Sequence, residues 1–376
     1  MLAVMTTETS GVDRIEPNLE TLLTLLKKIC ETPAPTFNEG ERGKLVSRLL
    51  AKAGLEPETD GVGNVTAEVE GGTGPRIVIA AHLDTVFSLE TDVTVKKDGD
   101  RLRAPGIGDN SSSLAVMIHY AQNLKPTMPR PRLTLAATVG EEGLGDLYGV
   151  RELMKNRAQD FGGFIALDGH LGTVVNQAVG SKRFEVTFHA KGGHSWGDYP
   201  SPSAVHALGE AIHALTKLKV PSEPRSSLNV GQVSGGTSIN AIAQEAQFNL
   251  DLRSLDAKVL ANLENDALKR IKRAAKAHKA EVKLKQVGDR SAAQSDNKKL
   301  VTMAKLALQQ VGATVRTAAS STDANAAMAV GLPAISFGVY RGGDAHRQSE
   351  WMDPDSLITG YRALEHLMAQ LSESSQ

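Results

Sequence analysis

The chain has 376 residues, more than one hydrophobic core usually supports, so we expect at least two domains. Its apolar content of 41% and charged content of 23% are ordinary for a globular protein. The formal net charge of −1 gives no electrostatic reason to expect nucleic acid or an anionic membrane as a partner.

The N-terminal sequence and the cysteine content indicate where in the cell the protein is located. Residues 1–11 lack a basic leader and an apolar core, and no stretch approaches about 18 uninterrupted apolar residues. The single cysteine, Cys30, cannot form an internal disulfide and lies in a helical apolar pattern, so we expect it to be buried. A cytoplasmic protein without a membrane span is expected.

Helical and strand-like patterns alternate in the first third of the chain. The predicted elements are helices over 19–30, 41–53 and 111–123 and strands over 64–69 and 77–81. Asp98-Gly99, between the strand-like segments 93–95 and 101–102, is a hairpin signal. This alternation favours an α/β fold, a wound mixed sheet with helices on both faces.

The pattern changes at Lys182, where apolar and polar residues begin to alternate. The expected order is a strand around 184–188, a helix capped by Ser201, strands over 228–233 and 248–252, a helix over 256–278 and a strand at 282–284. This β-α-β-β-α-β order is the α+β ferredoxin-like unit, predicted for residues 182–295 as an insert. The wound domain, residues 1–181 and 296–376, then resumes with a helix to 311, a strand over 334–337 and a helix over 357–371.

Polar residues follow three apolar strands at the point where each strand ends. His82 and Asp84 follow segment 77–81, Glu141 and Glu142 follow 133–139, and Asp168 follows 164–167. Active sites of wound sheets form outside the carboxyl ends of their strands, so these side chains should converge. Unpaired acids packed together repel one another, and the usual remedy is a cation. The chain is therefore interpreted as a metalloenzyme.

Each residue has an alternative role when it is taken alone. In this alternative, His82 and Asp84 would form a structural hydrogen bond, and Asp109, in a glycine-flanked turn, would cap the next helix. For Asp168 the same alternative of a turn aspartate applies. Glu141 and Glu142 are a solvated pair at a helix start, where the helix dipole favours acids. His346, after two glycines, is a surface histidine.

The conjunction of these residues favours the metal interpretation over the separate alternatives. Two histidines and three carboxylates suit two zinc ions roughly 3.5 to 4 Å apart, with one carboxylate bridging them. Adjacent Glu141 and Glu142 point in opposite directions, so one can bind metal while the other acts as a general base.

These residues resemble the dinuclear zinc exopeptidase family that includes peptidase T, carboxypeptidase G, acetylornithine deacetylase and succinyl-diaminopimelate desuccinylase. The resemblance spans nearly the whole chain and implies two Zn²⁺ per subunit, with Co²⁺ or Mn²⁺ as possible substitutes. It implies that Asp109 bridges the ions, that the peptide after it is cis, that Asp84 orients His82 and that Glu141 is the general base. The five metal ligands that it implies are His82, Asp109, Glu142, Asp168 and His346.

The same resemblance assigns roles in the inserted domain, which acts in the family as a lid and dimerisation domain. His194 matches a histidine that reaches the neighbouring subunit's site to stabilise the oxyanion, with a local turn histidine as the alternative. Asn240 and Arg253 match positions that hold polar groups of the substrate and its carboxylate. A surface ion pair is the alternative for Arg253. A homodimer through the inserted domain follows from the resemblance.

The expected activity is metal-assisted amide hydrolysis, in which Glu141 takes a proton from the attacking water and passes it to the leaving amine. An aspartate at the position of Asp168 resembles the aminopeptidase, tripeptidase and dipeptidase branch of the family. An exopeptidase acting on the N-terminal amide bond of small peptides is therefore expected. The alternatives are an N-acyl-amino-acid deacylase, a carboxypeptidase and an inactive peptide-binding relative.

Overall fold

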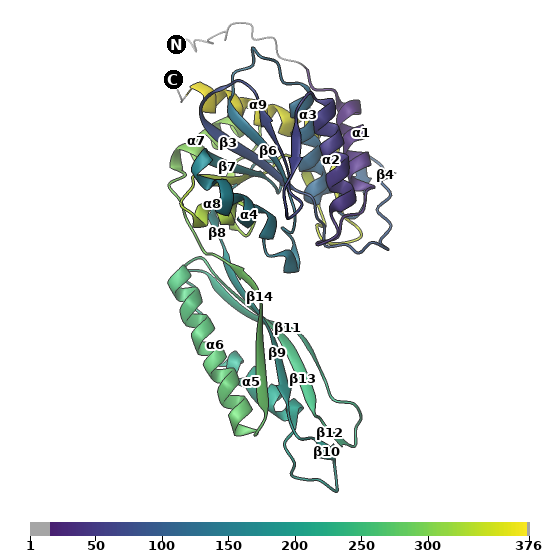
Figure 1. Cartoon of the computed structure of the whole chain (residues 1–376), viewed down its shortest axis with the longest axis vertical. Helices are drawn as coiled ribbons and strands as arrows, with labels where there is room; N and C mark the ends of the chain where they lie inside the picture. The colour runs from purple at the N-terminus through teal and green to yellow at the C-terminus, as the bar shows by residue number, and fades with distance from the viewer. Residues whose placement is uncertain (1–15, 374–376) are drawn as a thin grey trace, which may run out of the picture. The chain divides into compact units, whose positions relative to one another are not determined.

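The computed structural model describes residues 16–373, which divide into two units (Figure 1). The first unit comprises residues 16–176, 296–318 and 322–373, and the second comprises residues 177–295 and 319–321. Residues 1–11, on which the expectation about a leader depends, lie outside the described part of the chain. None of the described helices is long and apolar enough to cross a lipid bilayer.

An eight-stranded mixed sheet forms the centre of the first unit, in the order β1-β2-β6-β3-β7-β16-β8-β15. Its strands are β1 (Pro57–Thr59), β2 (Val65–Val69), β3 (Thr73–His82), β6 (Pro131–Thr138), β7 (Phe161–Leu167), β8 (Thr173–Ala178), β15 (Arg316–Ser320) and β16 (Ala334–Phe337). The four neighbours β6, β3, β7 and β16 are parallel, whereas β1, β2 and β8 pair antiparallel. The parallel strands therefore bring their carboxyl ends to one edge.

Helices cover both faces of this sheet, as the sequence predicts. They are α1 (Leu19–Cys30), α2 (Gly40–Lys52), η1 (Ile107–Ser112), α3 (Ser113–Gln122), η2 (Gly143–Gly145), α4 (Tyr148–Arg157), η3 (Ala158–Asp160), α7 (Lys298–Gln310), α8 (Ala324–Ala329) and α9 (Ser356–Glu373). Alternate strand residues such as Ile77 and Ile79 share one core with α1, α2, α3, α7 and α9. The intervening residues, such as Val78, are buried on the other face, where α8 packs on β7 and β16 and α4 packs on α8.

A small second sheet in the same unit carries the loops around Asp109 and His346. Its order is β17-β18-β5-β4, with β4 (Lys96–Asp98), β5 (Arg101–Arg103), β17 (Arg341–Gly343) and β18 (Trp351–Asp353). The hairpin predicted at Asp98-Gly99 is present, but its first strand is β4 and not residues 93–95. Asp98 pairs with Arg101, so the turn consists of only Gly99 and Asp100, and β4 and β5 pair directly beside this turn.

The second unit has the predicted order β9-α5-β11-β13-α6-β14, with its main sheet ordered β11-β13-β9-β14 and wholly antiparallel (Figure 1). Alternate residues such as Val186, Phe188 and Phe248 pack with both helices. The elements are β9 (Gly180–His189), β10 (Gly193–His194), α5 (Ala204–Thr216), β11 (Ser226–Gly235), β12 (Ala241–Ile242), β13 (Glu245–Ser254), α6 (Ala257–Ala277) and β14 (Glu281–Arg290).

Helix α5 begins later than predicted. Its cap is Ser203 and not Ser201, because the Pro202 carbonyl accepts from the Gly192 N–H and the Ala204 N–H donates to the Ala243 carbonyl. These bonds keep the chain extended through Ser203. The buried face of α5 includes Ala207 and Ala211.

Candidate metal centre

Three neighbouring parallel strands bring the candidate residues together. β3 ends at His82, β6 is followed by Glu141 and Glu142, and β7 is followed by Asp168. β3 lies between β6 and β7, and His82 is in register with Thr138 at the end of β6. The side chains after these ends therefore meet at one edge of the sheet.

Asp109 joins two of the groups that could hold a metal ion. Among residues 16–373, three groups have ligand atoms within 4.8 Å of one another: His82 with Asp109 and Asp168, Asp109 with Glu142 and His346, and His82 with Glu141 and Glu142. Oδ1 of Asp109 lies 3.1 Å from Nε2 of His82, and Oδ2 lies 3.1 Å from Nε2 of His346. One carboxylate thus offers an oxygen to each of two groups, which suits a bridge between two ions.

The ring of His82 is oriented by Asp84. Its Nδ1 lies 3.0 Å from the carbonyl oxygen of Asp84 and 3.5 Å from Oδ1 of the same residue. An N–H at Nδ1 donates to these oxygens, which leaves Nε2 to face Asp109 and to bind a metal. Burial lowers the pKa of His82, but hydrogen bonds to Asp109 and Asp84 outweigh burial and raise this pKa well above its usual value.

The other groups of the cluster also have shifted pKa values. Hydrogen bonds to Asp109 and Glu142 raise the pKa of His346 to about 11. Burial, reinforced by the charge of Asp109, raises the pKa of Asp168 to about 7. Burial also opposes ionisation of Asp109, but hydrogen bonds from His346 and His82 prevail and lower its pKa.

This donor set fits divalent metal ions. The cluster holds more carboxylates than imidazoles, and their mutual repulsion in a buried site is what bound cations relieve. Carboxylate oxygen and imidazole nitrogen are ligands that zinc and related divalent ions prefer. The residues present are therefore suited to hold such ions.

Asp84 also fixes the backbone of the glutamate pair. Its side chain is completely buried, and its carboxylate accepts hydrogen bonds from the N–H groups of Glu141 at 3.0 Å and Glu142 at 2.9 Å. The hydroxyl of Thr36 donates to the same carboxylate. Asp84 thus links the His82 ring to the segment carrying both glutamates, which sequence reasoning did not anticipate.

Glu350 holds the loop that carries Asp109. The Asp109–Asn110 peptide bond is cis, as expected from the resemblance. Glu350 is 1% exposed, and its carboxylate accepts from the N–H groups of Gly106, Gly108 and Asp109, each at 2.9 Å. Sequence reasoning missed this residue, because a glutamate four positions after His346 has no distinguishing pattern.

Replacement of Glu350 is expected to destabilise the first unit and loosen Asp109. Glu350→Ala leaves three buried N–H groups without an acceptor, which should lower the free energy of unfolding by about 3 kcal/mol or more. Glu350→Gln should lose less, because its remaining carbonyl oxygen can still accept from Gly108 and Asp109. Urea unfolding followed by circular dichroism measures both, with Glu152→Ala, a change at a partly exposed position on α4, as control. Equal stability of Glu350→Ala and the unmutated protein would contradict this role.

The alternative roles of these residues can be compared with the geometry. Glu141 and Glu142 are 5% and 6% exposed, so they are not a solvated pair, although Glu142 directly precedes the short helix η2. Asp109 does not cap α3, whose cap is Ser112. His346 is half exposed, yet its Nε2 lies 3.0 Å from Oε1 of Glu142.

The three candidate residues of the inserted domain lie in the second unit. His194 is on β10, and its Nδ1 accepts from the N–H groups of Trp196 and Gly197, both at 3.2 Å. The Asn240 carbonyl accepts from the Ser195 N–H at 2.9 Å, so Asn240 lies beside the His194 segment. Arg253, near the end of β13, donates from Nε to Asp251 at 2.7 Å, which is the ion pair considered as its alternative.

Comparisons with known proteins agree with the fold and with the kind of site. The model of Peptidase family M20/M25/M40 matches residues 78–370. A solved tripeptidase structure from Staphylococcus aureus has a TM-score of 0.81 at 22% identity and covers 95% of this chain and 100% of that chain. The Bacillus subtilis YXEP protein, titled a dinuclear metal binding peptidase from the M20 family, has a TM-score of 0.70 at 19% identity and covers 94% and 98%.

A further similar protein is named for a reaction other than peptide hydrolysis. The succinyl-diaminopimelate desuccinylase of Corynebacterium glutamicum is 26% identical over 254 residues, which is 64% of this chain and 68% of that protein. The two solved structures, both below 25% identity, share the mixed α/β fold. Peptide hydrolysis and removal of an acyl group thus both occur among the names of similar proteins.

Proposed function

Because the chain belongs to Peptidase family M20/M25/M40, a metallopeptidase family, we propose that it is a dinuclear zinc exopeptidase that hydrolyses the N-terminal amide bond of small peptides. The observation that carries the proposal is the position of Asp109 between two ligand groups. His82 and Asp168 would hold one ion with it, and Glu142 and His346 the other. Co²⁺ or Mn²⁺ are the substitutes to test.

Glu141 is the proposed general base. Bound zinc ions would supply Lewis acidity, which makes water a better nucleophile and the amide carbonyl a better electrophile. Glu141 takes the proton of the attacking water and delivers it to the leaving amine. Its backbone N–H and that of Glu142 donate to Asp84, which holds the segment that carries both glutamates.

His194 is proposed to stabilise the oxyanion. Because its Nδ1 accepts two backbone N–H groups, the neutral ring carries its proton on Nε2 and can donate it. His194 and Arg253 lie toward opposite ends of β13, since Glu245 to Arg253 alone spans about 26 Å of extended strand (Figure 1). One small peptide cannot touch both residues of one chain.

A homodimer resolves this separation and is part of the proposal. In it, residues 182–295 act as a lid and dimerisation domain, and His194 serves the neighbouring subunit. Arg253 and Asn240 bind polar groups of the substrate from different subunits, because Asn240 lies beside the His194 segment. A cytoplasmic location is also proposed. It is consistent with the single cysteine of the chain, Cys30, which is free and buried.

The nature of the substrate is inferred from one site residue and from similar proteins. Asp168 and the fold shared with a tripeptidase favour peptides with a free amino end. The similarity to a desuccinylase keeps an N-acyl-amino-acid deacylase as the second candidate, with a carboxypeptidase as a further one. An inactive peptide-binding relative is disfavoured, because such proteins typically lose a metal ligand or the base, and here the full set is present.

Product analysis tests the proposed reaction. The zinc-loaded protein is incubated with a tripeptide and, separately, with its N-acetylated form, and products are identified by mass spectrometry. We expect release of the first residue from the free tripeptide alone. Release of acetate from the blocked form would replace the exopeptidase with a deacylase.

A further inference from the structure

Phe37 is an exposed aromatic residue in a backbone conformation that large side chains rarely adopt. It is the third residue of a tight turn closed by the Asn38 N–H and the Pro35 carbonyl at 2.7 Å, and its φ is 72°. Glycine or asparagine is usual at such a position. The side chain is nevertheless 61% exposed. A strained, exposed aromatic residue calls for a functional explanation.

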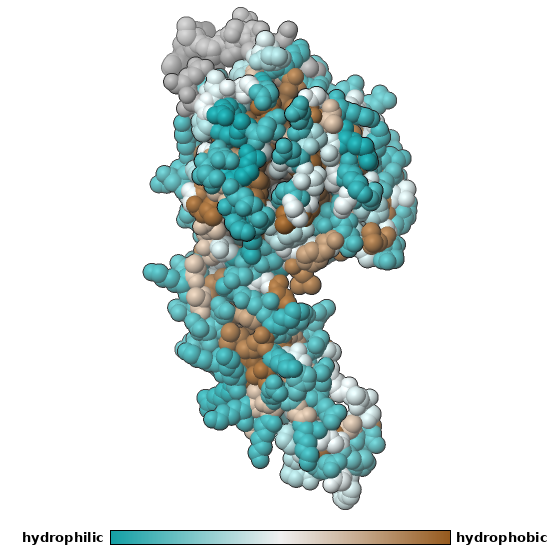
Figure 2. Space-filling model, viewed as in Figure 1, coloured by the Kyte–Doolittle hydropathy of each residue, from teal (hydrophilic) through white to brown (hydrophobic). Residues whose placement is uncertain are grey.

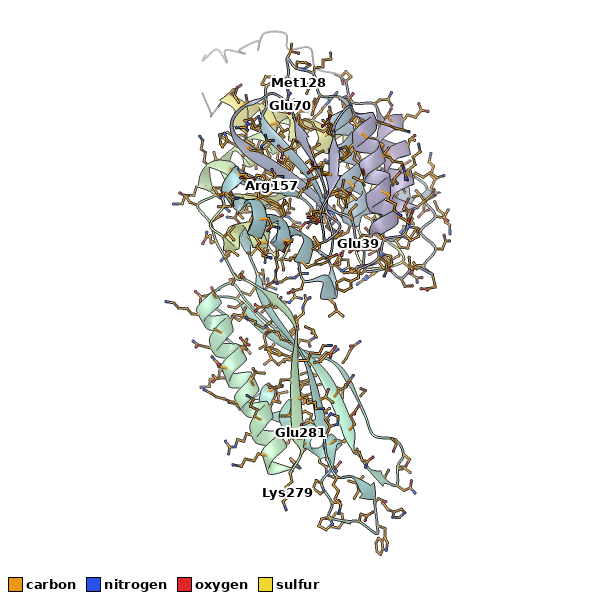
Figure 3. The ribbon with its side chains drawn as sticks, viewed as in Figure 1. Glu39, Glu70, Met128, Arg157, Lys279 and Glu281 are labelled. Carbon is orange, nitrogen blue, oxygen red and sulfur yellow. The ribbon has the colours of Figure 1, made fainter. Side chains whose placement is uncertain are left out.

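Two buried carboxylates attach this turn to the glutamate pair. Oε1 of Glu39, which is 4% exposed and labelled in Figure 3, accepts from the N–H groups of Phe37 at 3.0 Å and Gly140 at 3.1 Å. Oδ2 of Asp84 accepts from the Thr36 hydroxyl and from the Glu142 N–H, both at 2.9 Å. The backbone at Phe37 therefore lies next to the segment that carries Glu141 and Glu142.

The ring of Phe37 has a fixed support. It stacks on Tyr148 with ring centroids 5.8 Å apart, and the Tyr148 hydroxyl donates to the Val62 carbonyl at 3.1 Å. The Tyr148 ring in turn covers Gly140, where an added Cβ would lie 2.1 Å from it. The Phe37 ring is thus supported on one side by Tyr148, whose own ring covers Gly140 directly before the glutamate pair.

Two further apolar side chains are exposed on the segments that flank Phe37. Val86, 43% exposed, follows Thr85, which forms a β-bridge with Pro35. Leu144, 61% exposed, comes two residues after Glu142. We call Phe37, Val86 and Leu144 the Phe37 wall. Figure 2 shows hydrophobic residues at the lower margin of the unit that carries α1 to α4.

We propose that the Phe37 wall binds an apolar side chain of the substrate residue next to the scissile amide. A ligand of this kind is favoured over a protein partner because Glu39 and Asp84 join the turn of Phe37 to the segment that carries Glu141 and Glu142. The wall thereby makes the enzyme selective for leucine-like over glycine residues. This inference rests on the proposed function for its reaction, and it names the substrate class of the same site.

Selectivity between matched peptides tests the wall. Burial of a leucine side chain predicts a kcat/KM for Leu-Gly-Gly at least about tenfold above that for Gly-Gly-Gly. This ratio should fall about fivefold or more in Phe37→Ala and in Phe37→Gly. Both variants remove the ring, but only glycine relieves the backbone strain. The control Leu306→Ala removes an exposed apolar side chain from α7, which supplies none of the candidate site residues, and should keep the ratio.

Other outcomes separate this inference from the proposed function. If only acyl amino acids are cleaved, the exopeptidase assignment fails, and the ratio of N-acetylleucine to N-acetylglycine cleavage tests the wall in the same way. Calorimetric titration of the zinc-loaded protein with leucine hydroxamate and glycine hydroxamate gives the corresponding ratio of Kd values without turnover. An unchanged ratio in both Phe37 variants, or a fall in only one of them, would overturn the inference.

Discussion

Glu141→Gln is expected to keep its metal ions and to lose at least about a hundredfold of kcat, the usual contribution of a positioned general base. Glutamine has the shape of glutamate but cannot take a proton at neutral pH. The bond from the Glu141 N–H to Asp84 belongs to the backbone and survives the change, so the segment should keep its conformation. Steady-state kinetics and metal analysis by mass spectrometry on the same preparation measure both quantities.

The neighbouring glutamate provides the matched comparison. Glu142→Gln should lower metal occupancy, because Glu142 belongs to the group with Asp109 and His346. Glu152→Gln, at a partly exposed position on α4, should change neither quantity. Glu141 also belongs to a group with His82 and Glu142 that could hold a metal ion, so the experiment must distinguish a general base from a metal ligand. A Glu141→Gln variant that works at nearly the original rate, or that loses its metal, would refute the role of Glu141 as a base.

The sequence predicts most of the fold where long periodic segments determine it. The helix over 19–30 has the predicted bounds, and the strand over 334–337 also matches. The edge strand β1 was not predicted because it has only three residues, and β8 and β15 were not predicted because their place is set by pairing with strands distant in sequence. The start of α5 was misplaced for a related reason, since its cap depends on bonds to Gly192 and Ala243.

The candidate site could be predicted as a set of residues but not as a network. Residues at strand ends can be recognised because parallel strands end together, and His82, Glu141 and Asp168 are identified in this way. Glu350 and Glu39 could not be recognised, because their function is to accept backbone N–H groups from distant segments. A single sequence gives no signal for such contacts. Phe37 was missed for the same reason, since only its φ and its exposure distinguish it.

Asp109→Ala is expected to abolish binding of both metal ions, whereas His82→Ala and His346→Ala should each weaken one site more than the other. The carboxylate of Asp109 lies 3.1 Å from Nε2 of His82 and 3.1 Å from Nε2 of His346, so its removal affects both ligand groups at once. Loss of a partner outside the ligand shell already costs about 10- to 100-fold in affinity, and loss of a shared ligand should cost more.

Metal stoichiometry after dialysis at a fixed free zinc concentration distinguishes these variants. The unmutated protein should retain two ions per chain, the histidine variants about one, and Asp109→Ala almost none. Asp266→Ala, an exposed aspartate on α6, is the control and should retain both. Circular dichroism must show that Asp109→Ala is folded, because its neighbours are buried. If folded Asp109→Ala keeps one ion, Asp109 is a ligand of a single site. The ion that remains would then be held by the group formed by His82, Glu141 and Glu142. In that case Glu141 would be a ligand, and the base would have to be sought elsewhere.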